Sequence, residues 1–181
     1  MDRVALRRTG EGRWTAFGPG PLPDDPKVVG FEDIDGYGGA EMYAVGWGGE
    51  IWWYDGKKWR QADSPTSAIL TSMTCAGDGA VYAVGHDGVM VKGRKDQWTL
   101  VDTGRDEHLK DVELYAGEVY VCSDFAIFRL GPAGLAEEVE FAKKGDMPAT
   151  CLHLFATPGE LVSLGTKDVF VKREAAWFRL V

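Results

Sequence analysis

Short runs in which apolar and polar positions alternate dominate this sequence, and glycine-rich turns separate them. Alternation with a period of two residues is typical of β-strands that bury one face. Residues 41–45, 50–54 and 58–62 form such runs, and Asp55-Gly56 is a hairpin signal because glycine adopts positive φ without a Cβ clash. No segment keeps the 3.6-residue period of a helix, so the sequence predicts an all-β protein with little helix.

The strand pattern repeats about every 40 residues. Similar segments occur at Glu41–Gly46, Ala80–Gly85, Glu118–Ser123 and, more weakly, Glu160–Gly165. The intervals from Gly46 to Gly85, Ser123 and Gly165 are 39, 38 and 42 residues. A tryptophan also recurs near the end of the unit, at Trp59, Trp98 and Trp177, with an earlier copy at Trp14. A repeat of this length is typical of the four-stranded blades of a β-propeller.

Each repeat is expected to supply four strands. The strands expected in the first repeat cover 28–34, 41–45, 50–54 and 58–62, with a turn at Gly36–Gly39, and those in the second cover 68–75, 81–84, 89–92 and 97–101. We therefore expect one β-propeller domain over residues 1–181, with about four complete blades and an N-terminal half-blade. The expected bounds are 1–17 for the half-blade and approximately 27–63, 67–102, 107–141 and 149–181 for the blades.

The N-terminal half-blade has no complement at the other end of the sequence. Residues 4–6 and 13–17 match only the third and fourth strands of a repeat, whereas residues 150–181 already supply four. We expect an open or partial ring in which residues 1–17 pack as the outer half of a blade. Either the chain is part of a longer propeller, or another copy or a partner covers the exposed edges, or the last strand is misassigned.

The repeat resembles a known class of proteins. Tyr43–Gly46 (YAVG), Gly49–Trp59 (GEIWWYDGKKW) and Asp63–Thr66 (DSPT) resemble bacterial propellers of the BNR-like and WD/YVTN-like class and, more loosely, kelch repeats. The resemblance covers nearly the whole chain and implies a binding scaffold. Some short bacterial propellers of this kind look like the immunity partners of secreted toxins.

The sequence departs from that class in two places. The unit 107–141 lacks the tryptophan and the Asp-Gly hairpin, which leaves the pairing of its outer strand open. The Asp box, Ser-x-Asp-x-Gly-x-Thr-Trp, is absent, so the resemblance implies no sialidase-like activity.

Composition narrows the setting of the protein. A formal net charge of −8 argues against nucleic-acid binding, which needs a basic face. No apolar run approaches the ~20 residues of a membrane helix, and the first residues lack a signal-peptide core. Cys75, Cys122 and Cys151 are odd in number and widely spaced, which favours reduced thiols and a cytoplasmic location.

Candidate catalytic residues are sparse. His86, His108 and His153 show no metal-ligand spacing, and a single histidine in a strand is more often structural. We interpret the paired acids Asp24-Asp25 and Asp33-x-Asp35 as solvated turn residues. The first strands carry an uneven polar set, comprising Glu32, Asp33, Asp111, Glu113 and His153. We therefore expect no catalytic residue, no metal and no cofactor.

The variable loops are the best candidate for a binding site, because loops on a rigid scaffold commonly carry binding residues. The candidates lie between second and third strands or between blades, and they are Trp47, His86, Arg105, Asp106, His108, Asp124, Phe125, Lys143, Lys144 and Lys167. The expected partner is another protein, with a toxin as the sharpest hypothesis, or a second copy of the chain. The alternative is a lectin-like propeller that stacks sugars on exposed aromatic side chains.

Overall fold

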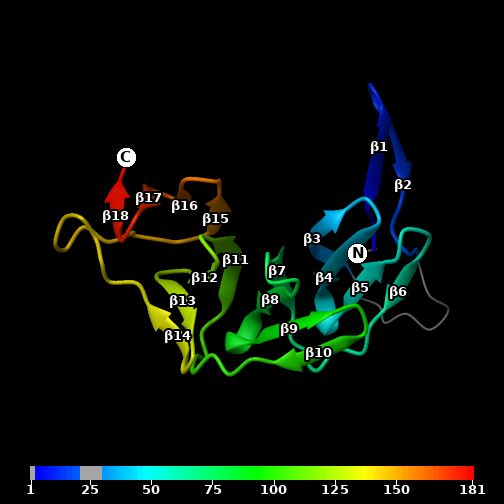
Figure 1. Ribbon diagram of the computed structural model, residues 1–181, viewed down its shortest axis with the longest axis horizontal. Helices are drawn as coiled ribbons and strands as arrows, with labels where there is room; N and C mark the ends of the chain where they lie inside the picture. Colours follow the sequence, from blue (N-terminus) through cyan, green and yellow to red (C-terminus); the bar gives the residue numbers. More distant parts are fainter. Residues whose placement is uncertain (1–2, 21–29) are drawn as a thin grey trace.

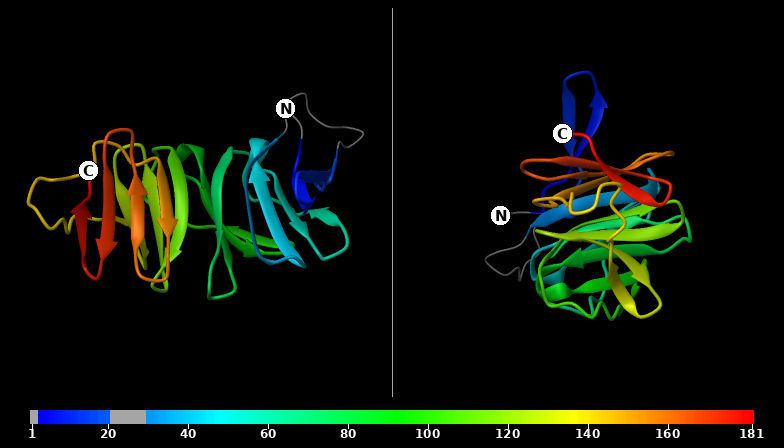
Figure 2. Two further views of the ribbon diagram at one scale, coloured as in Figure 1. Left: turned by 90° about the horizontal axis from the view of Figure 1, so that it is seen from above. Right: turned by 90° about the vertical axis from the view of Figure 1, so that its left-hand side faces the viewer.

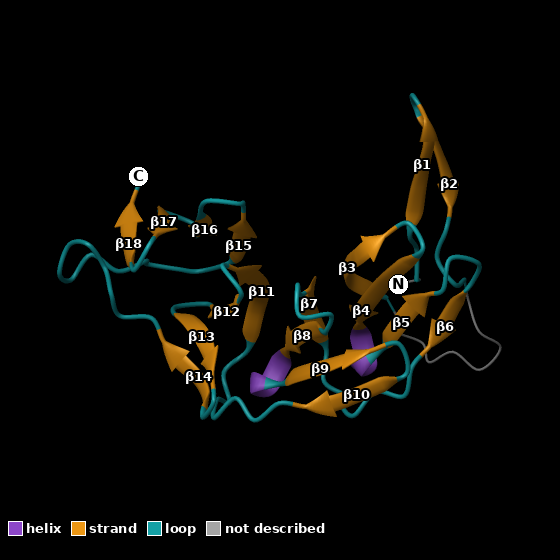
Figure 3. Cartoon of the chain, viewed as in Figure 1, coloured by secondary structure: helices purple, strands orange, loops and turns teal. Residues whose placement is uncertain are grey.

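The structure is a computed structural model that describes residues 3–20 and 30–181. Its strands form a two-stranded hairpin and four antiparallel four-stranded sheets, each with its strands in sequence order. Figure 3 shows that strands and loops make up nearly all of the chain. The β-propeller expected from the repeats is confirmed, with four complete blades and a separate N-terminal hairpin.

The hairpin consists of β1 (Leu6–Gly10) and β2 (Arg13–Ala16). The first sheet contains β3 (Phe31–Gly38), β4 (Glu41–Gly46), β5 (Ile51–Tyr54) and β6 (Trp59–Gln61). The second contains β7 (Leu70–Cys75), β8 (Val81–Gly85), β9 (Met90–Arg94) and β10 (Gln97–Leu100). The third contains β11 (Leu109–Tyr115), β12 (Glu118–Ser123), β13 (Ile127–Gly131) and β14 (Gly134–Glu137). The fourth contains β15 (His153–Ala156), β16 (Leu161–Leu164), β17 (Val169–Arg173) and β18 (Ala176–Arg179).

The four sheets stand side by side along an open arc (Figures 1 and 2). The first strand of each sheet lies on the inside of the arc, where β3 contacts β7, β7 contacts β11 and β11 contacts β15. Two 3₁₀ turns, η1 (Trp47–Gly49) and η2 (His86–Gly88), follow the second strands of the first two sheets. No helix among the described residues has the length and apolar character needed to cross a membrane.

The hydrophobic core is divided into three parts, one between each pair of adjacent sheets. Two of the recurring tryptophans, Trp98 and Trp177, belong to these interfaces. Trp98 is 8% exposed, packs edge-on against Tyr43 of the preceding sheet and donates its indole N–H to the Lys95 carbonyl. Trp177 is fully buried. Trp98 and Trp177 are therefore packing residues between blades, and burial of each indole stabilises the contact between two sheets.

The N-terminal hairpin contacts the first sheet through its base. Phe17 packs against Tyr54 and Trp59, and the Trp59 indole donates to the Phe17 carbonyl at 2.6 Å. Arg3 forms a buried ion pair with Glu50. The strands themselves project away from the sheet (Figure 1), and Trp14 remains 59% exposed. Trp14 is thus a copy of the repeat in sequence but does not pack as Trp98 does.

Several expected strand boundaries were wrong. We expected a turn at Gly36–Gly39, but the strand has not ended there. β3 continues to Gly38 and pairs with β4 through two register shifts. The expected start of this strand at Val28 lies outside the described residues, as do Asp24 and Asp25. In the hairpin, the expected strand 4–6 is replaced by β1, which begins at Leu6.

The third sheet is complete despite its divergent sequence. β14 pairs with β13 over four residues, from Phe128↔Glu137 to Gly131↔Gly134. Leu135, 6% exposed, fills the interface on this outer strand, and Arg105 lies over the Phe128 ring at 4.4 Å. Leu135 therefore occupies the position on the outer strand that Trp98 and Trp177 hold in the second and fourth sheets.

The packing role of the recurring tryptophan gives a stability prediction. Trp98→Ala should lower the free energy of unfolding by about 3–5 kcal/mol, because it opens a cavity between two sheets. Trp47→Ala should cost about 1 kcal/mol or less, since Trp47 is only half-buried in a loop. Urea unfolding of both variants measures the order, and a larger loss for Trp47→Ala would show that the packing assignment is wrong.

Candidate functional site

The loops after the second strands and the connections between sheets meet on one side of the arc, which we call the loop face. Each such loop touches the connection that enters the next sheet. A Cβ on Gly49 would meet the Thr66 carbonyl at 2.2 Å, and one on Gly88 would meet the Arg105 carbonyl at 2.1 Å. In the third sheet, Cys151 N–H donates to the Asp124 carbonyl at 2.9 Å. These backbone contacts hold the loop face rigidly.

Several of the predicted site residues come together on the loop face. The His86 and His108 rings stack with centroids 4.2 Å apart, and Asp87 N–H donates to His108 Nδ1. Lys110 and Asp124 form an ion pair at 3.3 Å.

Two aromatic candidates on this face differ in exposure. Trp47 donates its indole N–H to Glu32, so this half-buried side chain is tied to the first strand of its own sheet. Phe125 follows β12 and is 72% exposed, and it is the apolar side chain of the loop face that a partner could cover most fully.

Other predicted residues lie apart from this group. Arg105 is turned toward the third sheet, where it donates to the Leu135 carbonyl at 3.2 Å. Lys143 and Lys144 belong to a long connection at the outer edge of the arc (Figure 1). That connection is held to β18 by Ala142 N–H, which donates to the Trp177 carbonyl, and by an Asp146–Arg179 ion pair. Asp106 and Lys167 are exposed loop residues.

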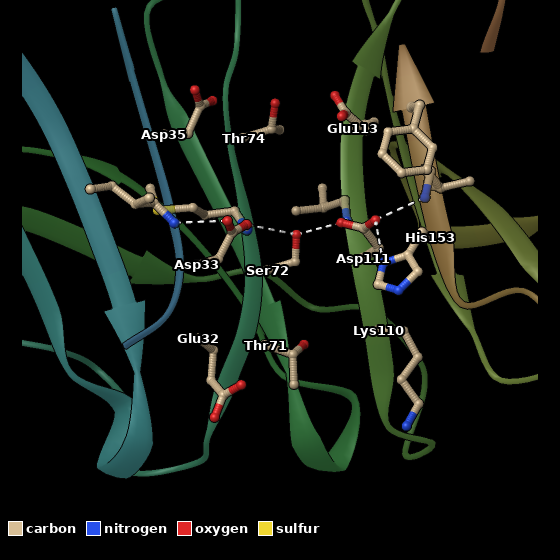
Figure 4. Close-up of a pocket in the computed structure, with 15 residues that line it drawn as sticks. Glu32, Asp33, Asp35, Thr71, Ser72, Thr74, Lys110, Asp111, Glu113 and His153 are labelled. Carbon is tan, nitrogen blue, oxygen red and sulfur yellow. Dashed lines mark hydrogen bonds and ion pairs between the residues drawn. The ribbon is translucent and has the colours of Figure 1, made fainter. Parts of the chain in front are cut away.

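The inner strands line a cavity of about 460 Å³ at the centre of the arc. Its side chains lie in three levels, named as they are drawn in Figure 4. The lower level contains Glu32, Thr71 and Lys110; the middle level contains Asp33, Ser72, Asp111 and His153; the upper level contains Asp35, Thr74 and Glu113. Phe155 also lines the cavity, and its pairing with Val162 assigns it to the upper level, two residues beyond His153. Within a level the residues occupy equivalent strand positions, since Asp35, Thr74 and Glu113 pair with Tyr43, Tyr82 and Tyr120.

Carboxylates in this cavity satisfy the free edges of the inner strands. Each first strand has no strand on its inner side, so its outward N–H groups need other acceptors. Asp33 accepts Met73 N–H at 2.8 Å, Asp35 accepts Cys75 N–H at 2.7 Å and Asp111 accepts Leu154 N–H at 2.8 Å.

Glu113 completes the series, because it accepts a backbone hydrogen bond from Ala156. Acids of the first and third sheets therefore cap the inner edges of the second and fourth.

This arrangement corrects our interpretation of Asp33 and Asp35. They are half-buried strand residues that join two sheets, and they are not solvated turn acids. Between the acids, the Ser72 hydroxyl lies within hydrogen-bond distance of both Asp33 and Asp111 and shares its one proton between them. The uneven acidic set on the first strands is therefore a structural network that spans successive blades.

The upper level has an unusual electrostatic state. Burial raises the pKa of Glu113 to about 7, and the charges of Asp111 and Asp35 push it in the same direction. Burial also raises the pKa of Asp33 against the opposing effect of its hydrogen bonds. The carboxylates of Asp35, Asp111 and Glu113 are thus held near one another in a partly buried cavity, and partial protonation of Glu113 relieves the repulsion between them.

The described residues offer little for metal or nucleophilic chemistry. No three His, Cys, Asp or Glu side chains in this part of the chain are grouped closely enough to hold a metal ion. Burial raises the pKa of the Cys122 and Cys151 thiols, which disfavours the reactive thiolate. The His153 Nδ1 atom lies 3.7 Å from an Asp111 carboxylate oxygen, which is longer than a hydrogen bond.

Comparison with known proteins adds a relative to these observations. The sequence is 43% identical over 183 residues to the immune protein Tsi7 of Pseudomonas aeruginosa. The match covers 99% of this chain and 59% of Tsi7, so the chain spans about three fifths of the length of that relative. No family model matches the sequence.

Solved structures show the same fold at low sequence identity. YCF48 bound to D1 peptide matches 97% of this chain and 60% of its own, with a TM-score of 0.66 and 17% identity. The WD40 propeller domain of Doa1 matches 81% of this chain and 52% of its own, with a TM-score of 0.62 and 10% identity.

The designed protein Ika4 matches 83% of this chain and 94% of its own, with a TM-score of 0.60 and 14% identity. These likenesses confirm the propeller architecture, while the BNR-like and kelch-like subclasses stay predictions.

The capping network can be tested by removing one carboxylate. Asp111→Ala leaves Leu154 N–H without its acceptor, whereas the Ser72 hydroxyl can still donate to Asp33, and an unpaired buried donor costs about 1–3 kcal/mol. The exposed Glu137→Ala on β14 serves as the control and should change stability by less than about 0.5 kcal/mol. Equal urea midpoints for the two variants would contradict a capping role for Asp111.

Glu113 gives a pH prediction. Its pKa in the folded chain, about 7, lies above the ordinary value of 4.5, so the folded state keeps a proton that the unfolded state releases. This contribution to stability is fully present below about pH 4.5 and is lost as the pH rises through about 7. The loss should be on the order of 1 kcal/mol after allowance for solvent screening.

Glu113→Gln removes this titration. The variant should therefore gain stability relative to the natural chain between about pH 5 and 8. Urea unfolding of both proteins across that range measures the difference, and a difference that does not change with pH would contradict the prediction.

Proposed function

We propose that this chain is an immunity protein that binds a bacterial toxin and neutralises it. The similarity to the immune protein Tsi7 over 99% of this chain carries the proposal. The fold is compatible with it, because a propeller presents variable loops on a rigid frame. We further propose that the chain acts in the cytoplasm and acts by binding rather than catalysis.

The loop face is the surface we assign to the toxin. It carries the exposed Phe125 beside the Lys110–Asp124 ion pair and the stacked His86 and His108 rings. An exposed aromatic ring surrounded by polar groups is the usual make-up of a binding hot spot. The backbone contacts beneath these loops limit the entropy lost on binding.

A lectin-like function has less support. Sugar binding in each blade would need exposed aromatic rings at repeated positions. The repeated Trp98 and Trp177 are buried between sheets, and the half-buried Trp59 donates its indole N–H to Phe17. Trp52 is buried too, with Arg3 over its ring.

Co-expression tests the proposed function. If the gene beside this one encodes a toxin, that toxin should arrest growth of a bacterial host when expressed alone, and co-expression of this chain should restore growth. The tagged chain should also retain the toxin during purification. If the toxin neither co-purifies with the chain nor is neutralised by it, the immunity assignment is wrong.

Two matched truncations test the loop face. Phe125→Ala should weaken toxin binding at least about tenfold, because Phe125 supplies the exposed anchor. Leu100→Ala also removes an exposed apolar side chain, but from outer strand β10, and should leave the affinity within about twofold. Titration calorimetry of both variants separates the surfaces; full affinity of Phe125→Ala would place the toxin elsewhere while leaving the immunity function intact.

A further inference from the structure

The upper level of the central cavity has features that the capping network does not explain. Asp35 accepts the N–H groups of Gly36 and Cys75, and Glu113 accepts those of Leu114 and Ala156. Asp35 also accepts a hydrogen bond from the Cys75 thiol. A carboxylate offers about four acceptor positions, so both groups keep at least one. Figure 4 shows the two carboxylates at one height, with Thr74 between them.

The Thr74 hydroxyl also distinguishes the upper level. The residue is only 6% exposed and lines the cavity, yet its hydroxyl has no hydrogen-bond partner among the described residues. The hydroxyl is not one of the fully buried atoms without a partner in the described part of the chain, so it is open to the cavity and can bond to a ligand there. Ser72, one level below in the same strand, lies within hydrogen-bond distance of two carboxylates, so position 74 differs from it.

The negative charge of this level is not balanced by the chain. Lys110 is the one lysine or arginine among the described residues that line the cavity, and it lies in the lower level, where it pairs with Asp124. Repulsion among Glu113, Asp111 and Asp35 contributes to the raised pKa of Glu113. A cation in the upper level would remove this repulsion.

The aromatic residue of the upper level, contributed by the fourth sheet, indicates which type of cation fits. Phe155 lines the same cavity and is 51% exposed. A planar guanidinium can stack on an aromatic ring while it donates several hydrogen bonds in fixed directions, whereas an ammonium lacks this shape. The donors of a guanidinium match the acceptors of Asp35, Glu113 and Thr74.

We propose that the upper level of the cavity, formed by Asp35, Thr74, Glu113 and Phe155, binds a guanidinium group. The site lies on the inner strands and is distinct from the loop face, so it does not depend on the immunity function. The group could be supplied by an arginine side chain of a protein or by a small guanidinium compound, and the two sources share the recognition chemistry.

Nuclear magnetic resonance titration of the whole chain at about pH 8 tests the site, since Glu113 is then mostly ionised. Methylguanidinium is the probe, and methylurea, of similar shape but neutral, is the control. We expect methylguanidinium to shift the backbone amide signals of Asp35, Thr74 and Glu113 in a saturable manner, with no such effect from methylurea. A blocked Gly-Arg-Gly peptide distinguishes the sources: tighter binding than methylguanidinium identifies an arginine side chain, and weaker binding identifies a small compound.

Variants assign the effect to the upper level. Asp35→Asn and Glu113→Gln keep acceptors for the backbone but remove charge, and each should weaken methylguanidinium binding about tenfold. Glu32→Gln removes one charge from the lower level of the same cavity and should leave the affinity within about twofold. Absence of saturable shifts, equal shifts with methylurea, or unchanged affinity in both upper-level variants would overturn the proposal.

Discussion

The free inner edge of each sheet is the constraint on which this structure depends. A propeller blade ends at its first strand, and the outward N–H groups of that strand have no neighbouring strand to accept them. Here the preceding sheet supplies the acceptor, as Asp33 does for Met73 and Asp111 does for Leu154. The bonds between sheets are therefore charge-assisted on the inside of the arc and apolar further out, where side chains such as Trp98 pack. One row of side chains thus performs both tasks, orienting the blades and satisfying their edges.

This solution places negative charge where it is hardest to solvate. Three acids from the first sheet and two from the third line one cavity, while the second sheet contributes the hydroxyls of Thr71, Ser72 and Thr74. The hydroxyls of the second sheet separate the acids of the first and third sheets, since Ser72 lies between Asp33 and Asp111 within hydrogen-bond distance of both. The remaining repulsion is concentrated on Glu113, whose pKa it helps to raise. The same acids that hold the blades together therefore make the cavity a host for positive charge.

The fold was readable from the sequence because its signals are local and repeated. Hairpin turns, the Tyr-x-Val-Gly segments and the recurring tryptophan each appear several times, so an error in one copy does not obscure the others. The cavity was not readable in the same way. Gly36 and Gly38 indicated a turn, whereas the strand passes through both with shifts in register, and this moved Asp33 and Asp35 from a solvated turn to a sheet edge. Their partners on β7 lie about 40 residues away in the sequence and are brought close only when the blades pack. Thr74 carried no signal at all, because a threonine in a strand is ordinary until its hydroxyl is seen without a partner.

The loop face and the cavity differ in what sequence change can do to them. A loop residue such as Phe125 is largely exposed, so its replacement alters the binding surface and little else. An acid such as Asp111 cannot change freely, since the edge of the following sheet would lose its acceptor. Position 113 lies between these cases, because the Ala156 bond requires an acceptor but not a charge, and glutamine could supply it. Retaining a glutamate there costs stability at neutral pH, where the buried carboxylate begins to ionise beside Asp111 and Asp35. Glutamine could replace Glu113 in the fold without this loss of stability. The glutamate is explained if its charge is used, and the upper level is where that charge would attract a cation.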